Sequence, residues 1–124
     1  MTTVLLVDDS KFTCNRTIEM LREIDPDVNV IPAYLPSKAL ELVQSQGSTY
    51  DLAIIDFNMP EMNGLELAEK IRAIIPYERI VILTASSAFT THSQTIPEGM
   101  HFCQKPVNEE KLRAVLQFQR RISA

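Results

Sequence analysis

Five side chains suited to metal or phosphate chemistry stand at the ends of short runs that are typical of buried strands: Asp8, Asp9, Asp56, Thr84 and Lys105. Carboxylates are ligands for hard cations such as Mg²⁺, whereas hydroxyl and ammonium groups bind anions such as phosphate. Taken singly, each residue has an ordinary explanation as a helix cap, a turn residue or a solvated charge. Whether they share one chemistry depends on whether the fold brings them together.

Short apolar runs alternate with amphipathic stretches along the chain, and no linker, repeat or low-complexity segment interrupts them. Runs of this length, rich in Val, Ile and Leu, are typical of strands that are buried on both faces of a sheet. The predicted strands are Val4 to Val7, Val28 to Tyr34, Leu52 to Ile55, Ile80 to Leu83 and His101 to Gln104.

Helical patterns lie between these strands and after the last one. The first stops before Pro26, the second begins at Pro36 and closes at Gly47, and the clearest covers Leu65 to Ile75. Asn108 is placed to cap a last helix. The side chains expected to turn inward from these helices are Cys14, Ile18, Leu21, Ile24, Ala39, Leu40, Val43, Leu67, Ala68, Ile71, Ile75, Leu112, Val115 and Leu116.

The alternation predicts one domain, residues 1–124, built from five βα units. Right-handed crossovers then give a five-stranded parallel sheet covered by helices on both faces, with the flavodoxin-like strand order 2-1-3-4-5. From Ser86 to Gly99, Ser, Thr and Pro dilute any helical face, so we expect a short or irregular helix there. Ligands of such folds bind at the carboxyl ends of the strands, which is the edge where all five candidate residues fall.

Composition excludes several classes of protein. The chain has 124 residues, 45% of them hydrophobic, a formal charge of −4 and a pI near 5.1, which argues against a direct nucleic-acid surface. No apolar run approaches the roughly 20 residues that cross a bilayer, and the start of the chain lacks a secretory pattern, so we expect a cytoplasmic protein without membrane contact. Cys14 and Cys103 lack CxxC spacing and are expected to be buried free thiols.

The predicted topology makes the first and third strands neighbours and so crowds Asp8, Asp9 and Asp56 into one pocket. Two such charges about 4 Å apart repel by roughly 1 to 4 kcal/mol at effective dielectrics between 80 and 20, so the cluster calls for a cation. Oxygen ligands alone favour Mg²⁺ (or Mn²⁺) over zinc. Asp56 fits the nucleophile of a phosphoryl transfer, with Thr84 and Lys105 as donors to an anion.

Four runs of the sequence carry a family resemblance: Val7-Asp8-Asp9-Ser10, Asp56-Phe57-Asn58-Met59-Pro60-Glu61-Met62-Asn63-Gly64, Thr84-Ala85 and Lys105-Pro106. Together they closely resemble receiver domains of two-component response regulators, of the kind typified by chemotaxis regulators. Any one run is a weak signal. Four in the right order, each at the end of the right predicted strand, make the resemblance specific, and it covers the whole chain.

The resemblance implies that Asp56 takes its phosphoryl group from the phosphohistidine of a sensor histidine kinase or phosphotransfer protein, or from small donors such as acetyl phosphate. It implies that Asp9 and Asp56 ligate Mg²⁺ with the backbone carbonyl of Asn58, while Asp8 holds a metal-bound water. Such a domain assists its own phosphorylation and dephosphorylation but is not a conventional turnover enzyme. Its further partners are a downstream effector or an attached output domain, and a homodimer is compatible with the family.

By the same resemblance, Thr84 and Lys105 would hydrogen-bond the phosphoryl oxygens, and the peptide between Lys105 and Pro106 would be cis. Thr84 would then move toward the phosphate and Phe102 would rotate inward, reshaping the face formed by the fourth helix, the fifth strand and the last helix. Phe102 is otherwise an ordinary core residue. The interval from Thr84 to Lys105 is one residue shorter than is typical of the family, and it lacks the usual alanine-rich helix. Asn58 and Ser86 resemble positions that tune the rate of dephosphorylation.

Three other readings remain open from the sequence. A flavin binder of the same fold would favour a Ser/Thr/Gly-rich loop after the first strand, where this chain has two acids. Aspartyl phosphatases of the haloacid dehalogenase type carry a second Asp two residues after the nucleophile, whereas here Asp8 is followed by Asp9 and Ser10. A degenerate receiver used only for protein contacts would not need the complete set of five residues.

Overall fold

A computed structural model of the chain describes residues 2–85 and 99–123. Its strands and helices follow one another as β1 (Thr3–Val7), α1 (Lys11–Ile24), β2 (Asn29–Ala33), α2 (Pro36–Gln46), β3 (Leu52–Asp56), α3 (Gly64–Ile71), β4 (Ile80–Thr84), β5 (His101–Gln104) and α5 (Glu109–Ser123), with short 3₁₀ helices at Gly47–Thr49 and Tyr77–Arg79. The expected helix between Ser86 and Gly99 lies almost wholly outside the described residues.

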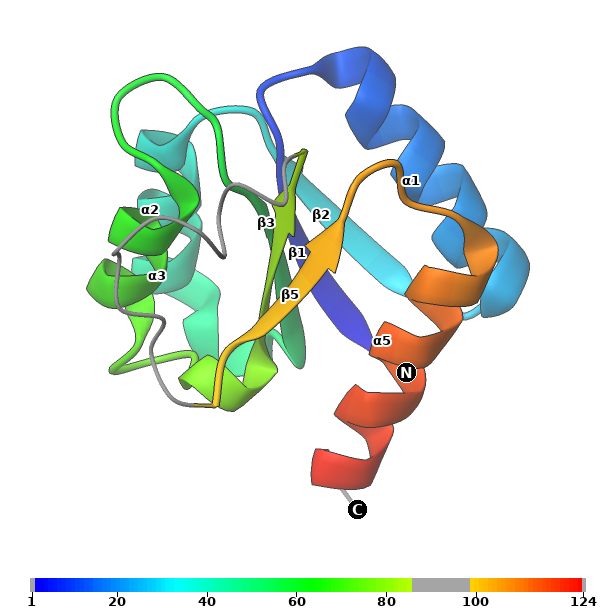
Figure 1. Cartoon of the computed structure of the whole chain (residues 1–124). Helices are drawn as coiled ribbons and strands as arrows, with labels where there is room; N and C mark the ends of the chain where they lie inside the picture. Colours follow the sequence, from blue (N-terminus) through cyan, green and yellow to red (C-terminus); the bar gives the residue numbers. More distant parts are fainter. Residues whose placement is uncertain (1, 86–98, 124) are drawn as a thin grey trace.

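The five strands form one parallel sheet in the order β2-β1-β3-β4-β5, as the sequence predicts (Figure 1). In this order β1 and β3 are neighbours at the centre of the sheet. Val7 pairs with Ile55, and Asp56 pairs with Leu83 one strand further along. The residues that follow these positions therefore emerge side by side at one edge.

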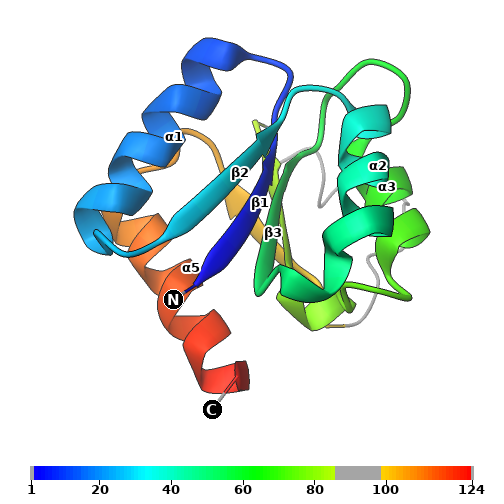
Figure 2. The same cartoon turned by 180° about the vertical axis from the view of Figure 1, so that it is seen from behind.

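Helices cover both faces of the sheet, with α2 and α3 on one face and α1 and α5 on the other (Figure 2). The strands supply both cores by alternation, since successive side chains of a strand point to opposite faces. On β1, Leu5 packs toward α2 and α3, whereas Val4 and Leu6 pack toward α1 and α5. All of these side chains are almost completely buried.

Side-chain caps fix where the helices next to the sheet edge begin. Ser10 caps α1, because its hydroxyl accepts a hydrogen bond from the backbone N–H of Thr13 at 3.3 Å. Asn108 caps α5 in the same way by accepting from the N–H of Lys111 at 2.8 Å, as predicted. Since Ser10 performs the capping, a helix cap does not explain the carboxylate of Asp9.

Some of the expected boundaries need correction. The second strand is Asn29–Ala33 rather than Val28 to Tyr34, and α3 ends at Ile71 rather than at Ile75. Ile75 is still buried, but Pro76 disfavours helical geometry in the residue before it, so the chain leaves the helix early.

Gly47 ends α2 but does not use the left-handed conformation that often closes a helix, because its φ is −57°. Its small size matters instead, since a Cβ would lie 2.3 Å from Cγ2 of Ile74 and that side chain would have to move.

The cysteines are free and buried, as predicted. Burial raises the pKa of Cys14 to about 11, and it also raises the pKa of Cys103, so both remain protonated at neutral pH. No helix among the described residues combines the length and apolar character that crossing a bilayer requires.

Candidate functional site

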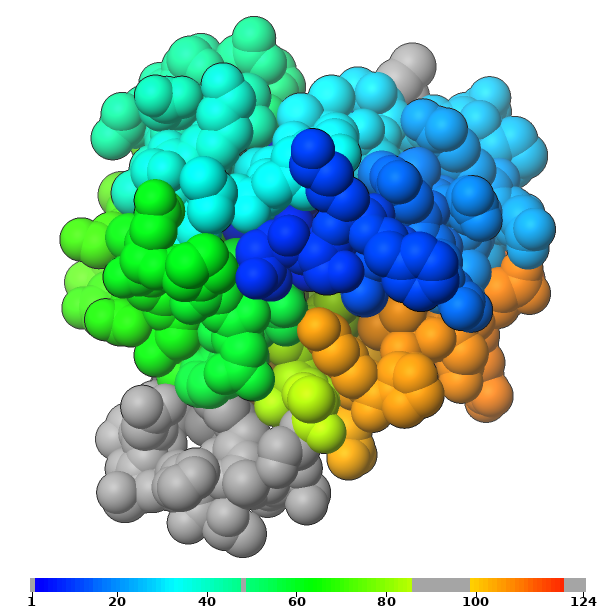
Figure 3. All heavy atoms as spheres, turned by 90° about the horizontal axis from the view of Figure 1, so that it is seen from above, coloured from blue at the N-terminus to red at the C-terminus, as the bar shows by residue number. Residues whose placement is uncertain are grey.

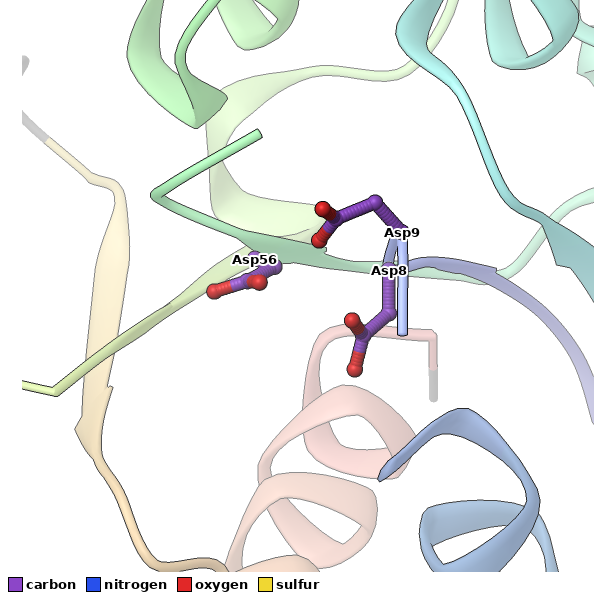
Figure 4. A group of neighbouring side chains, drawn as sticks. All are labelled: Asp8, Asp9 and Asp56. Carbon is purple, nitrogen blue, oxygen red and sulfur yellow. The ribbon is translucent and has the colours of Figure 1, made fainter. Parts of the chain in front are cut away.

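Three carboxylates meet at the carboxyl end of the central strands. Asp8 and Asp9 follow β1 directly, Asp56 is the last residue of β3, and one oxygen of each lies within 4.8 Å of the others (Figure 4). Asp8 and Asp56 are buried, with 1% and 6% of their surface exposed, whereas Asp9 is exposed. The predicted cluster therefore exists, and it opens to solvent on the side of Asp9.

The parallel ladder positions these side chains. Beyond the end of β1, the N–H of Asp8 still donates to the carbonyl of Ala33 on β2 at 3.0 Å, so Asp8 stays aligned with the sheet. On β3, the N–H of Phe57 donates to the carbonyl of Leu83 at 2.8 Å, which holds Asp56 at the strand end. The site is thus built at the ends of the central strands, which lie between two buried layers.

Asp8 is only half satisfied. Its Oδ1 accepts a hydrogen bond from the N–H of Ser10 at 2.9 Å, but Oδ2 is buried and has no hydrogen-bond partner among the residues that the structure describes. Burial raises the pKa of Asp8 above its usual range, and the charge of Asp56 adds to this, although the hydrogen bond from Ser10 opposes it. A buried acceptor without a partner costs about 1–3 kcal/mol. An acceptor in that state fits a cation or a cation-bound water.

Lys105 approaches the cluster from β5. Its Nζ lies 2.9 Å from Oδ1 of Asp56, and this ion pair is largely buried. The backbone N–H of Lys105 donates to the carbonyl of Thr84 at 2.7 Å, which brings the buried Thr84 and Lys105 to the same edge. When all three aspartates are ionised, three carboxylates and one ammonium leave a charge of −2, which a divalent cation balances.

The segment after β5 is held in a fixed shape. The peptide between Lys105 and Pro106 is cis, as the resemblance implies. Nζ of Lys111 donates to the carbonyls of Gln104 and Pro106 at 2.8 and 3.1 Å. These two hydrogen bonds fix the first turn of α5 to the end of β5. Lys105 therefore projects from a backbone that is bound on both sides.

Gly64, the first residue of α3, allows this helix to start directly beneath Asp56. Its N–H donates to the carbonyl of Phe57 at 2.8 Å, and a Cβ at this position would lie 2.7 Å from the carbonyl oxygen of Asp56. Only a residue without a side chain permits that approach without a backbone shift.

Gly64→Ala is therefore expected to destabilise the domain by about 1–2 kcal/mol, as overpacking against rigid backbone does. Urea denaturation of both proteins measures the difference. Glu69→Ala, on the exposed side of the same helix, serves as the control and should change the free energy of unfolding by less than about 0.5 kcal/mol. Equal stability of Gly64→Ala and the parent would show that α3 is not held against β3 as described.

Glu61, in the loop between β3 and α3, has a backbone conformation that the sequence did not reveal. Glu61 has a φ of 71°, a left-handed conformation that costs a residue with a side chain about 1–2 kcal/mol. Its carboxylate accepts hydrogen bonds from the N–H and the hydroxyl of Ser37 on α2, at 2.9 and 3.1 Å. No local pattern signals this contact, because its two residues lie 24 positions apart.

The remaining predicted residues are placed as follows. Asn58 is exposed in the loop after β3, and Phe102 is half-buried on β5, packed against the core on the side of α2 and α3. Ser86 lies outside the described residues. The structure thus brings together the five residues of the predicted pocket, and it leaves the roles of Asn58, Phe102 and Ser86 as predictions.

Comparisons with known proteins point in one direction. The sequence model of the protein family described as the response regulator receiver domain matches residues 4–117 of this chain. The chain is 34% identical over 111 residues to the alginate biosynthesis transcriptional regulatory protein AlgB of Pseudomonas putida, covering 89% of this chain and 24% of that protein. It is 31% identical over 115 residues to the transcriptional regulatory protein ZraR of Escherichia coli, covering 92% and 25%. The chain thus spans about a quarter of the length of these relatives.

Solved structures agree. A two-component response regulator from Clostridium difficile superposes over 100% of both chains with a TM-score of 0.83 and 25% sequence identity. The chemotaxis protein CheY4 of Vibrio cholerae superposes with a TM-score of 0.76 and 30% identity, covering 94% of this chain and 97% of that one.

Proposed function

The chain belongs to the receiver domain family of two-component response regulators, and on that premise we propose that it is a phosphorylation switch in which Asp56 accepts a phosphoryl group. The observation that carries the proposal is the cluster of Asp8, Asp9 and Asp56, with Lys105 2.9 Å from Asp56. A structural ion pair between Lys105 and Asp56 would not need two further carboxylates beside it. A phosphorylation site needs all four side chains.

Mg²⁺ is the cation that these residues suit. Asp9 and Asp56 would hold it together with the backbone carbonyl of Asn58, and Asp8 would bind one of its waters through the oxygen that has no hydrogen-bond partner. When bound, Mg²⁺ neutralises the oxygens of the phosphoryl group as it transfers. The donor set is oxygen only, which favours Mg²⁺ over zinc.

The chain's own groups account for the rest of the transfer. An oxygen of the Asp56 carboxylate attacks phosphorus, the P–N bond of a phosphohistidine donor breaks, and the imidazole leaves with the bonding electron pair. The ammonium group of Lys105, already beside Oδ1 of Asp56, is placed to pair with a phosphoryl oxygen. The hydroxyl of Thr84 is proposed to donate to another phosphoryl oxygen. Burial beneath the sheet edge strengthens these interactions.

A groove beside the site is suited to the donor protein. It encloses about 420 Å³ between α1 and the segment after β5, and its lining includes Phe12, Met20, Lys105 and Val107. Phe12 is 73% exposed, so it offers apolar surface to a partner at this groove. We place a helix of a sensor histidine kinase or phosphotransfer protein in this groove, with its phosphohistidine directed at Asp56.

Thr84 and Phe102 are proposed to transmit phosphorylation to the surface that an effector or output domain binds. When Thr84 follows the phosphoryl group, Phe102 gains room to turn inward, and the surface of β5 and α5 changes for an effector or an attached output domain. The fourth helix that the resemblance implies for this face falls on residues that the structure does not describe. The two curated relatives are transcriptional regulatory proteins about four times as long, so transcriptional control through an attached domain is one form that the output can take.

The direct test is phosphorylation of the parent protein by acetyl phosphate. With Mg²⁺ the mass should rise by one phosphoryl group, hydroxylamine should remove it, and peptide mapping should place it on Asp56. With EDTA in place of Mg²⁺ the label should be nearly absent. A label on another residue, or none with Mg²⁺ present, contradicts the proposal.

Lys105→Ala separates phosphorylation from signalling. We expect this variant to accept the phosphoryl group more slowly, because a charge-assisted hydrogen bond to the phosphoryl oxygens is lost. It should also fail to pass the change to β5. NMR shifts around Phe102 before and after phosphorylation measure this, with Lys70→Ala, which removes an exposed cation from α3, as the control for loss of a positive charge. Parent-like shifts in phosphorylated Lys105→Ala would remove Lys105 from the switch.

A further inference from the structure

We propose that Glu61 is a positioning residue for phosphorylation: its carboxylate clamps the loop between β3 and α3 to the start of α2 and so holds the metal-binding backbone of that loop beside Asp56. The loop contains Asn58, whose carbonyl is the expected third ligand of Mg²⁺. The inference rests on the proposed function for its role, but the clamp itself is a contact within the free protein.

The contact is made at two points on a single residue. One oxygen of Glu61 accepts from the N–H of Ser37 at 2.9 Å, and the other accepts from the Ser37 hydroxyl at 3.1 Å. Two acceptors on one rigid group fix direction as well as distance. Figure 3 shows the segment after β3, in green, lying against the start of α2, in cyan, at the edge of the sheet that carries the site.

The start of α2 needs such a partner. Its N-cap residue is Leu35, which makes no side-chain hydrogen bond to the helix, and Pro36 has no N–H to offer. The N–H of Ser37 is therefore the first donor of the helix, and it points out of an end that favours negative charge. Glu61 supplies the carboxylate that the local sequence of α2 lacks.

The backbone at Glu61 shows that the contact constrains the loop. The φ of 71° is one that glycine or asparagine adopts far more readily than glutamate. The N–H of Met62 donates to the carbonyl of Pro60 at 2.8 Å, and the side chains of Met59 and Met62 both pack against the core. A strained conformation persists where the surroundings over-determine it, and here they include the bond to Ser37.

The clamp predicts a specific loss when it is removed. Glu61 stands three positions after Asn58 and five after Asp56 in the same loop. Without the carboxylate, the loop is free to shift the carbonyl of Asn58 relative to Asp8, Asp9 and Asp56. Removing a group that orients a metal ligand typically weakens metal affinity 10-fold to 100-fold. We expect the Mg²⁺ dissociation constant to rise about 10-fold.

Two substitutions separate this role from ordinary stability. Glu61→Ala and Glu61→Gly both remove the carboxylate, but only glycine also relieves the left-handed strain. We expect Glu61→Gly to be clearly more stable than Glu61→Ala in EDTA, while both bind Mg²⁺ about 10-fold more weakly than the parent does. If Mg²⁺ affinity instead follows stability, so that Glu61→Gly binds like the parent, the clamp is disproved.

Two more variants exclude a plain effect of charge. Ser37→Ala keeps every charge and removes only the hydroxyl donor, so it should weaken Mg²⁺ binding by a smaller factor, of about 3 if the two bonds share the 10-fold loss equally. Glu69→Ala removes one negative charge from the exposed side of α3 and should leave Mg²⁺ binding unchanged. The proposal is overturned if Ser37→Ala binds Mg²⁺ like the parent, or if Glu69→Ala weakens Mg²⁺ binding as much as Glu61→Ala does. Either result would mean that Glu61 acts only through the long-range attraction of its charge for Mg²⁺.

The measurement is a Mg²⁺ titration of the unfolding midpoint for each variant, with hydrogen exchange of the Ser37 amide in EDTA as a second readout. The amide should exchange faster in both Glu61 variants than in the parent, and unchanged exchange would show that the clamp is absent. Neither readout requires phosphorylation. A parent that binds Mg²⁺ but takes no label would refute the proposed function and leave the clamp standing.

Discussion

Asp56→Asn is expected to abolish covalent labelling by acetyl phosphate, whereas the parent takes up one phosphoryl group. The amide has nearly the same shape as the carboxylate, so the fold should survive, but its oxygen is not an effective nucleophile and cannot form an acyl phosphate. Asp56 is also the partner of Lys105 at 2.9 Å, so the variant leaves that ammonium without its carboxylate. Intact-protein mass spectrometry after incubation with donor and Mg²⁺ gives the result directly.

Two controls make the loss interpretable. Asp27→Asn changes an exposed aspartate far from the site in sequence, and it should label like the parent. Asp9→Asn keeps the nucleophile but removes a metal ligand, so it should label slowly and approach the parent rate as Mg²⁺ is raised. Full labelling of Asp56→Asn would place the phosphoryl group on another residue and end the assignment.

The sequence predicted correctly that the five pocket residues meet at one edge of the sheet, because the position of each follows from local information. A buried strand has a recognisable run of apolar residues, its end can be located within a residue or two, and topology sends every strand end of a parallel sheet to one edge. The positions of Asp8, Asp56 and Lys105 could be predicted from these features alone. The strand order was predictable for the same reason, since short right-handed connections leave few arrangements.

The parts that sequence did not predict depend on contacts between distant segments. The hydrogen bonds from Ser37 to Glu61 join residues 24 positions apart, and neither neighbourhood identifies the other as its partner. Gly47 was expected to close α2 and does so, but the contact of its small residue with Ile74 could not be read from the local sequence. The early end of α3 is similar, because Ile75 keeps the burial that the helical pattern predicts while its backbone has left the helix.

Burial also distinguishes two residues that the sequence treats alike. Asp8 and Asp9 are adjacent carboxylates, and repulsion alone predicts that replacing either one with asparagine stabilises the metal-free protein. Of the two, Asp8 is buried, and one of its oxygens has no hydrogen-bond partner within the described part of the chain, whereas Asp9 is exposed to water. Replacing Asp8 should therefore stabilise the metal-free protein more than replacing Asp9 does. Replacing either residue should weaken the binding of Mg²⁺.

Metal binding should add a measurable part of the stability of the parent. At about 100 times its dissociation constant, a ligand of the native state stabilises by roughly 2.7 kcal/mol, which for a domain of this size raises the midpoint by about 10 °C. We expect the parent to gain most of this in Mg²⁺ and Asp9→Asn to gain little. In EDTA, Asp8→Asn should exceed the parent by about 1–2 kcal/mol, and Asp9→Asn should lie close to the parent.

The dependence on pH gives the decisive check of this last expectation. The pKa of Asp8 is raised in the folded state above its ordinary 3.8, chiefly by burial, so between these two values the folded protein binds more protons than the unfolded one. The metal-free parent therefore loses stability as pH rises through that window, and Asp8→Asn does not. The advantage of Asp8→Asn in EDTA should be small at the acid end, grow with pH and then stay constant. Thermal melts of both proteins across this range measure this advantage. If the advantage shrinks as pH rises, the surroundings of Asp8 stabilise its charged carboxylate instead of destabilising it.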